Sequence, residues 1–473
     1  MAIAQSAPEL TPFSGGVRYT APLRIPDRHA GRSGEPAESL RRPSTRLSSL
    51  LNFLRTDQML RNSLNLLLNT GVQAFLGFGF WIIAAHYFSA SNVGKATSLI
   101  SASTLIAFMG QLGLNITLMK YLPVSRKPNR MITAGIALAA SFTAAIAIVY
   151  ILIMPFISKP LSFVAHSPPL AIGFVVLTAG SGVNLVTDSV LLAGGKSKYT
   201  TLADGIVGGI AKIALVILLA GAGSYAVFGA VTGGFLAAAL ASVLLIAKTM
   251  HWRPDFREFR KELQPILSFS GVNYVASLLN LAPTLIVPLI VINKIGPSGT
   301  AYYYVSFQLA TLLWQAAYSV QDSFLVEGAA NGAITKALLM RSARILIALC
   351  VPSLIGVVLF GRLLLSAFGS QYGSHTESTL FPLMFSIIPI AIYHWCLVVL
   401  QLSNQLRAIV WTNAVYAAAI IGFAFVLAPR GLGGVTLGWP LGTSVAALVG
   451  GVVAIRSMRR TASARRNRAG NRS

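Results

Sequence analysis

The sequence predicts an all-α membrane protein that crosses the bilayer about 12 times. Hydrophobic residues make up 55% of the chain and charged residues only 11%, whereas soluble domains carry about 25% charged residues. Apolar runs of roughly 18–25 residues, the length that crosses a bilayer, follow one another with short polar breaks. Basic residues collect in every second connection between these runs, as expected for loops that lie on one side of a membrane.

The expected spans form two sets of six, separated by one longer polar connection. In chain order they cover residues 63–88, 96–119, 131–155, 170–193, 202–222, 225–248, 264–292, 299–321, 341–361, 379–402, 408–428 and 432–455. We therefore expect a first lobe over residues 59–248 and a second lobe over residues 264–455. Both sets begin on the same side of the membrane, so a repeat would be parallel. Transporters built from two such halves bind substrate at the interface between them.

Three polar segments lie outside the spans. Residues 1–58 are rich in Ser, Pro, Gly and Arg and predict a disordered, basic cytoplasmic tail. Residues 456–473 predict a second basic cytoplasmic tail. The connection over residues 249–263 places Phe256, Phe259 and Leu263 on one helical face among charged residues, which is typical of a short interfacial helix.

The distribution of basic residues predicts the orientation. If the N-terminus is cytoplasmic, 31 of the 37 Lys and Arg residues fall in the tails and the inner loops. The predicted outer side has only Lys95, Lys159, Lys294, Arg362 and Arg430. Because cytoplasmic loops carry the excess of Lys and Arg, both termini are expected in the cytoplasm. Orientation and contact with anionic membrane lipids then account for the net charge of +24, and we expect no nucleic-acid partner.

Polar stripes on several predicted spans indicate a hydrophilic cavity. A single amide inside a span is more often a bond between helices, worth only about 0.6 kcal/mol, but lining a cavity needs a polar face several turns long. Such faces occur on spans one, two and eight, and span seven adds an amide. The expected cavity residues are Asn65, Asn69, Gln73, Gln111, Asn115, Asn280, Tyr304, Gln308 and Gln315.

Three charged residues are expected at depth, where an ionised side chain is costly and marks function by default. Lys212 lies near the middle of span five, and Asp188 and Asp204 lie nearer the cytoplasmic ends of spans four and five. Lys212 is a candidate contact for an anionic substrate such as a pyrophosphate, or it forms a structural ion pair with either aspartate. Arg61, at the inner mouth of the span-one stripe, is a second candidate anion contact, or a charge that only sets topology.

Two helix pairs resemble those of a known superfamily. The stretch from Leu60 to Leu114 has an aromatic-rich helix, a short turn with Ser89 and Gly94, and a Leu-Gly-Leu near the end of the second helix. It resembles the first helix pair of polysaccharide and O-antigen flippases of the multidrug/oligosaccharidyl-lipid/polysaccharide (MOP) exporter superfamily. The stretch LAPTLIVPLIVINKIGPSGTAYYYVSFQLA resembles the equivalent pair in the second half. The resemblance covers roughly residues 60–455 and rests on helix pattern, not on a catalytic motif.

This resemblance implies two six-helix lobes arranged in a V around a central cavity. It implies alternating access and export of a lipid-linked oligosaccharide, with a polyprenyl pyrophosphate as the expected carrier, across the bacterial cytoplasmic membrane. Such export serves surface polysaccharide biosynthesis, including lipopolysaccharide O-antigen, and the partners would include a polysaccharide polymerase and glycosyltransferases. Basic residues in the cavities of relatives handle the anionic carrier, a role that would fall to Lys212 and Arg61.

Two alternatives stay open. A cation- or proton-coupled multidrug exporter of the same superfamily would use a membrane-embedded carboxylate, for which Asp188 is the best candidate. A polytopic glycosyltransferase or polymerase would need catalytic side chains on the outer face, where Glu377 is the only acidic residue expected. The chain shows no nucleotide-binding Gly-rich motif and no nucleophile elbow, so we expect a transporter without cofactors and not an enzyme.

Overall fold

The computed structural model describes residues 76–219, 221, 223–256, 271–330, 336–403 and 405–470. The predicted tail over residues 1–58 and residues 257–263 of the predicted linker lie outside these residues. The main helices are Leu76–Tyr87, α3 (Ala90–Gly110), α4 (Leu114–Tyr121), α5 (Pro128–Ile157), α6 (Pro168–Ala193), α7 (Ser197–Thr200), η4 (Thr201–Gly208), α8 (Gly209–Leu218), α9 (Gly223–Thr249), α11 (Gly271–Lys294), α12 (Pro297–Ala330), α13 (Lys336–Ser366), α14 (Ser370–Gly373), α15 (Thr376–Phe385), α16 (Ile387–Leu402), α17 (Leu406–Leu427) and α18 (Leu432–Gly470).

The predicted fold class is confirmed. In the described part of the chain, ten helices are long and apolar enough to cross a membrane. The helix α12 is not among them although it has 34 residues, because its polar stripe lowers its hydropathy. Together with the Leu76–Tyr87 helix, these helices match the order of the expected spans, and the protein is a multi-pass membrane protein.

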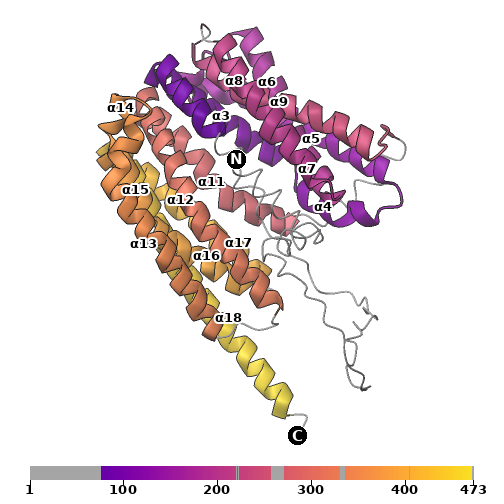
Figure 1. Ribbon diagram of the computed structural model, residues 1–473, viewed down its shortest axis with the longest axis vertical. Helices are drawn as coiled ribbons and strands as arrows, with labels where there is room; N and C mark the ends of the chain where they lie inside the picture. Colours follow the sequence, from indigo (N-terminus) through magenta and orange to yellow (C-terminus); the bar gives the residue numbers. More distant parts are fainter. Residues whose placement is uncertain are drawn as a thin grey trace, which may run out of the picture.

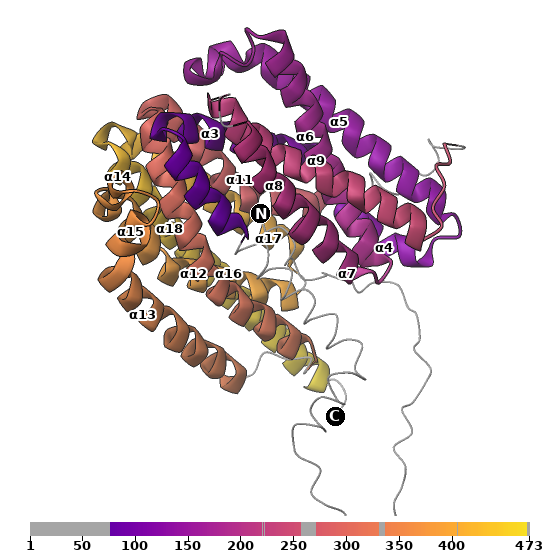
Figure 2. The same ribbon diagram turned by 45° about the horizontal axis from the view of Figure 1, so that its top comes forward.

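The helices form two groups that meet at one end and diverge toward the other (Figure 1). In the first group α6 packs against both α5 and α9, and in the second α17 packs against both α11 and α18. The same division is visible after a 45° turn (Figure 2). The groups join through α3, which packs against α11 and α12. A helix of the first lobe thus lies against the opening helix pair of the second.

The junction is tightest where α3 and α12 begin, at the predicted outer end. Gly94 of α3 lies so close to Pro297 that a Cβ atom there would overlap the proline carbonyl oxygen, and it would lie 3.1 Å from the Ala301 nitrogen. Small residues permit this close approach of helix backbones in membranes. The lobes are therefore in close contact at the predicted outer end, and Tyr274 of α11 also donates to the Met109 carbonyl near the end of α3 at 2.9 Å.

Two backbone irregularities interrupt the expected spans. Span two breaks between α3 and α4, where Leu112 and Gly113 adopt positive φ angles of 50° and 74°. Span five starts with a π-helical segment, η4 over Thr201–Gly208, before continuing as α8. A π turn is one residue wider than an α turn and occurs frequently at functional sites, so η4 changes the rotational position of the residues before it relative to α8.

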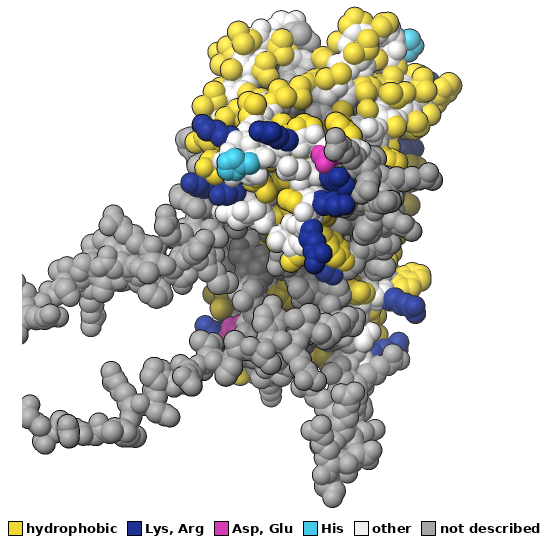
Figure 3. Space-filling model, turned by 90° about the vertical axis from the view of Figure 1, so that its right-hand side faces the viewer, with side chains coloured by type: hydrophobic (Ala, Val, Ile, Leu, Met, Phe, Trp, Pro, Cys, Tyr) yellow, Lys and Arg dark blue, Asp and Glu magenta, His cyan; other side chains and the backbone are white. Residues whose placement is uncertain are grey.

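The surface separates apolar and basic regions. Figure 3 shows a broad hydrophobic region at one end of the molecule and Lys and Arg side chains gathered below it. Many of the large apolar side chains of α5 and α13 are exposed, including Phe156 at 90% and Leu359 at 69%. Such exposure suits helices that face lipid tails rather than water.

The described start of the linker is attached to the first lobe. The carboxylate of Asp255 pairs with Arg130 at the start of α5, with 2.9 Å between Nε and Oδ2. The indole of Trp252 donates to the Asn129 carbonyl and to the Thr133 hydroxyl, both at 3.2 Å. Residues 251–256 form no helix, so this described part of the predicted interfacial helix is irregular chain.

A larger residue at Gly94 should separate the lobes at the predicted outer end. We expect Gly94→Val to lengthen the distance between spin labels at the exposed positions Tyr87 and Ser370, because the new side chain cannot fit against Pro297. Pulsed electron paramagnetic resonance on the purified protein measures this distance.

The matched control is Gly356→Val on α13, since a Cβ there meets no atom within 4 Å. The native cysteines, Cys350 and Cys396, are replaced by Ser in every labelled variant. Equal label distances in both glycine variants would contradict the role assigned to Gly94.

Candidate functional site

A cavity of about 260 Å³ lies where the two lobes face one another. Its walls come from the Leu76–Tyr87 helix, α3, α6, η4, α8 and α9 of the first lobe and from α11, α12 and the segment after α13 of the second. Hydroxyl groups contributed by α3, α11 and α12 line it. They belong to Ser101, Thr104, Thr284 and Thr311.

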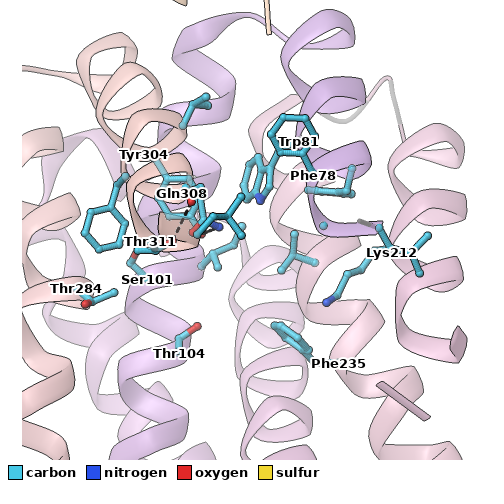
Figure 4. A pocket seen from close by; sticks show the side chains of 18 of the residues that line it. Phe78, Trp81, Ser101, Thr104, Lys212, Phe235, Thr284, Tyr304, Gln308 and Thr311 are labelled. Carbon is cyan, nitrogen blue, oxygen red and sulfur yellow. Dashed lines mark hydrogen bonds between the residues drawn. The ribbon is translucent and has the colours of Figure 1, made fainter. Parts of the chain in front are cut away.

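Four of the predicted cavity residues line this space. Tyr304, Gln308 and Gln315 do so from α12, and Lys212 from α8. The three α12 residues lie on one face because helical residues three and four apart are neighbours. The Gln308 amide donates to the Tyr304 hydroxyl at 3.4 Å, and Figure 4 shows this pair beside Thr311 and Ser101.

Aromatic rings form the other major part of the wall, and they pair across the lobes. The Trp81 and Tyr304 rings are 4.9 Å apart, and the Phe78 and Phe368 rings are 5.1 Å apart. Each pair joins a residue of the first lobe to a residue of the second. An aromatic face next to hydroxyl and amide groups suits a ligand with both apolar and hydrogen-bonding surfaces, as a sugar or a lipid-linked sugar has.

Lys212 brings a cationic side chain to the cavity. Its ammonium nitrogen lies 4.1 Å from the centroid of the Phe235 ring, within the range of a cation–π interaction. Figure 4 shows Lys212 and Phe235 on adjacent helices at one side of the cavity. The Asp204 carboxylate also lines the cavity and attracts the Lys212 charge.

Asp188 lies behind the cavity wall in a carboxyl pair. Asn184 on α6 donates to Asp204 at 2.9 Å and to Asp188 at 3.5 Å, so one amide links the two carboxyl groups. Asp188 is 5% exposed, and this predicted coupling residue does not itself line the cavity.

Asn280 lies outside the cavity, in a polar network within the second lobe. Its amide donates to the Tyr393 hydroxyl at 3.3 Å, which in turn donates to Asn413 at 2.6 Å. The Asn413 amide donates to the Ala276 carbonyl at 2.8 Å and closes the network onto α11. These bonds connect α11, α16 and α17. Asn280 therefore acts as an amide that bonds neighbouring membrane helices to one another.

The remaining predicted residues take other positions. Gln111 is buried at the break between α3 and α4, and Asn115 is partly buried on α4; neither lines the cavity. The Gln111 Oε1 atom has no hydrogen-bond partner among the described residues. Four predicted residues of the first span lie outside the described residues. They are Arg61, Asn65, Asn69 and Gln73.

Several lining residues escaped prediction because they are apolar or isolated. Trp81, Phe78 and Phe235 line the cavity, but aromatic residues are also common on lipid-facing helices, so their type alone carried no signal. Thr284 lies between apolar neighbours and belongs to no polar stripe. Its position after Pro283, inside a helix with two prolines, is the one available hint.

Comparison with known proteins relates the fold to one superfamily. No family model and no curated protein sequence matches the chain. Among solved structures, an inward-facing multidrug resistance MATE family transporter of the MOP superfamily superposes with a TM-score of 0.63 at 16% identity, covering 82% of this chain and 94% of that one. Lipid II flippase MurJ, in an inward closed conformation, superposes with a TM-score of 0.64 at 14% identity, covering 83% and 87%.

A MOP superfamily transporter from Pyrococcus furiosus gives a TM-score of 0.55 at 15% identity, covering 85% of this chain and 95% of that one. The chain therefore has the fold shared by these MOP superfamily transporters along most of its length. Identities near 15% establish the fold and leave the substrate open.

Removing the Asn280 amide should lower stability without changing ligand binding. Asn280→Ala breaks its hydrogen bond to Tyr393, and we expect a loss of about 1 kcal/mol of unfolding free energy. Thermal unfolding of the purified protein measures the loss. Gln308→Ala, which removes an amide that lines the cavity, provides the comparison. A larger effect of Asn280→Ala on ligand affinity than on stability would assign Asn280 to the site.

Proposed function

We propose that this protein moves an anionic, lipid-linked oligosaccharide across the bacterial cytoplasmic membrane by alternating access. The observation that carries the proposal is the composition of the inter-lobe cavity. Hydroxyl and amide groups suit the sugar, aromatic faces suit sugar rings and prenyl units, and Lys212 suits a phosphate or pyrophosphate. The MOP-type fold, which lipid II flippase MurJ shares, supports a transport role.

In this proposal the two lobes alternate between an arrangement in contact at the outer end and one that is open to the outer face. The present structure has the lobes together at Gly94 and Pro297, at the predicted outer end. Substrate would enter from the predicted cytoplasmic side, and separation of α3 from α12 would then open the cavity to the outer face. Glycan export in this form serves surface polysaccharide biosynthesis, with glycosyltransferases before it and a polymerase after it.

The carboxyl pair supplies the specific observation for a second candidate, a proton- or cation-coupled multidrug exporter. Asp188 and Asp204 both accept from Asn184, and Asp204 lines the cavity. Two neighbouring carboxyl groups favour the protonated form of one of them, and this proton could be released when the lobe rearranges. The same pair could couple ion movement to glycan export, so it favours a coupled transporter without selecting the substrate.

Deletion of the gene separates the two candidates. We expect lipid-linked oligosaccharide to accumulate on the cytoplasmic leaflet and surface polysaccharide to disappear, because the precursor no longer crosses the membrane. Extraction of lipid-linked sugars and immunoblotting of surface glycan measure these changes. Unchanged surface glycan together with increased drug sensitivity would contradict the proposal and favour the multidrug exporter.

Complementation with Lys212 variants tests the anion contact. We expect Lys212→Gln to reduce glycan export at least about tenfold, as loss of a charge-assisted hydrogen bond in a desolvated site predicts. Lys212→Arg should retain much of the export, since it keeps the positive charge. Protein levels in the membrane are matched by immunoblotting, and full export with Lys212→Gln would remove this residue from the mechanism.

A further inference from the structure

We infer that Gly234 and Phe235 of α9 are positioning residues that hold the Lys212 ammonium toward the cavity and away from Asp204. The inference deepens the proposed function and rests on it, because it concerns the anion contact of that site. Both residues follow Gly233 in a Gly-Gly-Phe sequence, which sequence analysis did not single out. Neither needs to touch the transported molecule to fulfil this role.

Gly234 makes space for the stem of the lysine. A Cβ atom at Gly234 would overlap Lys212 Cγ, and it would lie 3.0 Å from Lys212 Cε and 2.8 Å from the Gly208 carbonyl oxygen. The lysine methylene groups therefore lie directly across the α9 backbone. The absence of a side chain at this one position determines the path of Lys212 from α8 toward α9.

Phe235, the next residue, receives the charged end. The ammonium nitrogen lies 4.1 Å from the Phe235 ring centroid, and both residues line the cavity (Figure 4). A cation–π contact in a desolvated place stabilises this position of the flexible side chain. Since the ring is neutral, it holds the ammonium without cancelling its charge.

Asp204 is the residue that competes with Phe235 for the Lys212 ammonium. It lies on η4, lines the same cavity and attracts Lys212 electrostatically. Its Oδ2 atom is buried and accepts no hydrogen bond from the described residues, whereas Oδ1 accepts from Asn184. An ammonium that moved from Phe235 to this free oxygen would form an ion pair, and a paired lysine would attract a phosphate far less.

This arrangement makes the contact selective for charge. The Phe235 ring keeps the full positive charge of Lys212 at the cavity, where an anionic headgroup can replace the ring as its partner. Without the ring, the ammonium moves to Asp204. The affinity for an anionic ligand then falls more than the affinity for a neutral ligand of the same shape.

Binding of farnesyl pyrophosphate and of farnesol to the purified full-length protein in detergent tests the inference. The first probe carries the anionic group and the second lacks it. We expect Phe235→Leu to weaken farnesyl pyrophosphate binding about fivefold to tenfold more than farnesol binding. Phe235→Trp should keep the wild-type ratio of the two affinities, because the larger ring still accepts a cation.

A second-site variant distinguishes positioning from simple damage to the fold. Asp204→Asn removes the competing carboxylate, so the double variant Phe235→Leu/Asp204→Asn should regain most of the affinity for farnesyl pyrophosphate. A fold weakened by Phe235→Leu would not be repaired by that change. Failure of the double variant to recover the ratio of pyrophosphate to farnesol affinity would overturn the inference.

The glycine is tested with its neighbour as a control. Gly234→Ala should weaken pyrophosphate binding, whereas Gly233→Ala should not, because a Cβ at Gly233 meets only the end of the Leu215 side chain at 2.8 Å. In a Lys212→Ala background, Gly234→Ala should not lower the ratio of pyrophosphate to farnesol affinity any further, because crowding of the Gly208 carbonyl affects both probes alike. A further fall in that ratio would show that Gly234 does not act through Lys212.

The outcomes also separate this inference from the proposed function. If Lys212→Ala leaves the pyrophosphate affinity unchanged, the anion contact fails, and the positioning role fails with it. If Lys212→Ala weakens binding but Phe235→Leu and Gly234→Ala do not, the anion contact stands and only the positioning role is overturned.

Discussion

The cost of placing a charge or an unpaired polar group inside a bilayer is the constraint on which the rest of the structure depends. Two examples within the described residues show how the protein meets this cost locally. Asn280 is satisfied by Tyr393 within the second lobe, and Asn184 donates to both carboxyl groups in the first. Lys212 is accommodated differently: its methylene groups pack across α9, and its ammonium group lies over the Phe235 ring.

That constraint also explains where the cavity lies. A polar face several turns long cannot be matched by single partners on neighbouring helices, so the face of α12 that carries Tyr304, Gln308 and Gln315 lines a space between the lobes. The same helix packs against α3 at its first turn, through Pro297 and Gly94. Site and junction therefore share one element, and movement at the junction must change the site.

Much of this arrangement was predictable from sequence, since the signals are local. Span order follows from runs of apolar residues, and the α12 stripe follows from helical periodicity. The position of Asn280 was not predictable, because whether an amide faces a cavity or a tyrosine depends on which helix lies opposite. The π-helical η4, which carries Asp204, was not predictable either, and the role inferred for Gly234 depends on the path of a distant lysine.

The central claim is that the cavity carries an anionic lipid-linked sugar across the membrane. Reconstitution into liposomes with a fluorescent polyprenyl pyrophosphate-linked oligosaccharide, followed by quenching of the outer leaflet, measures this most directly. The account predicts that the protein makes the inner-leaflet substrate accessible to the quencher and that Lys212→Gln slows the exchange. Exchange no faster than in protein-free liposomes, both with and without an ion gradient, would contradict the account.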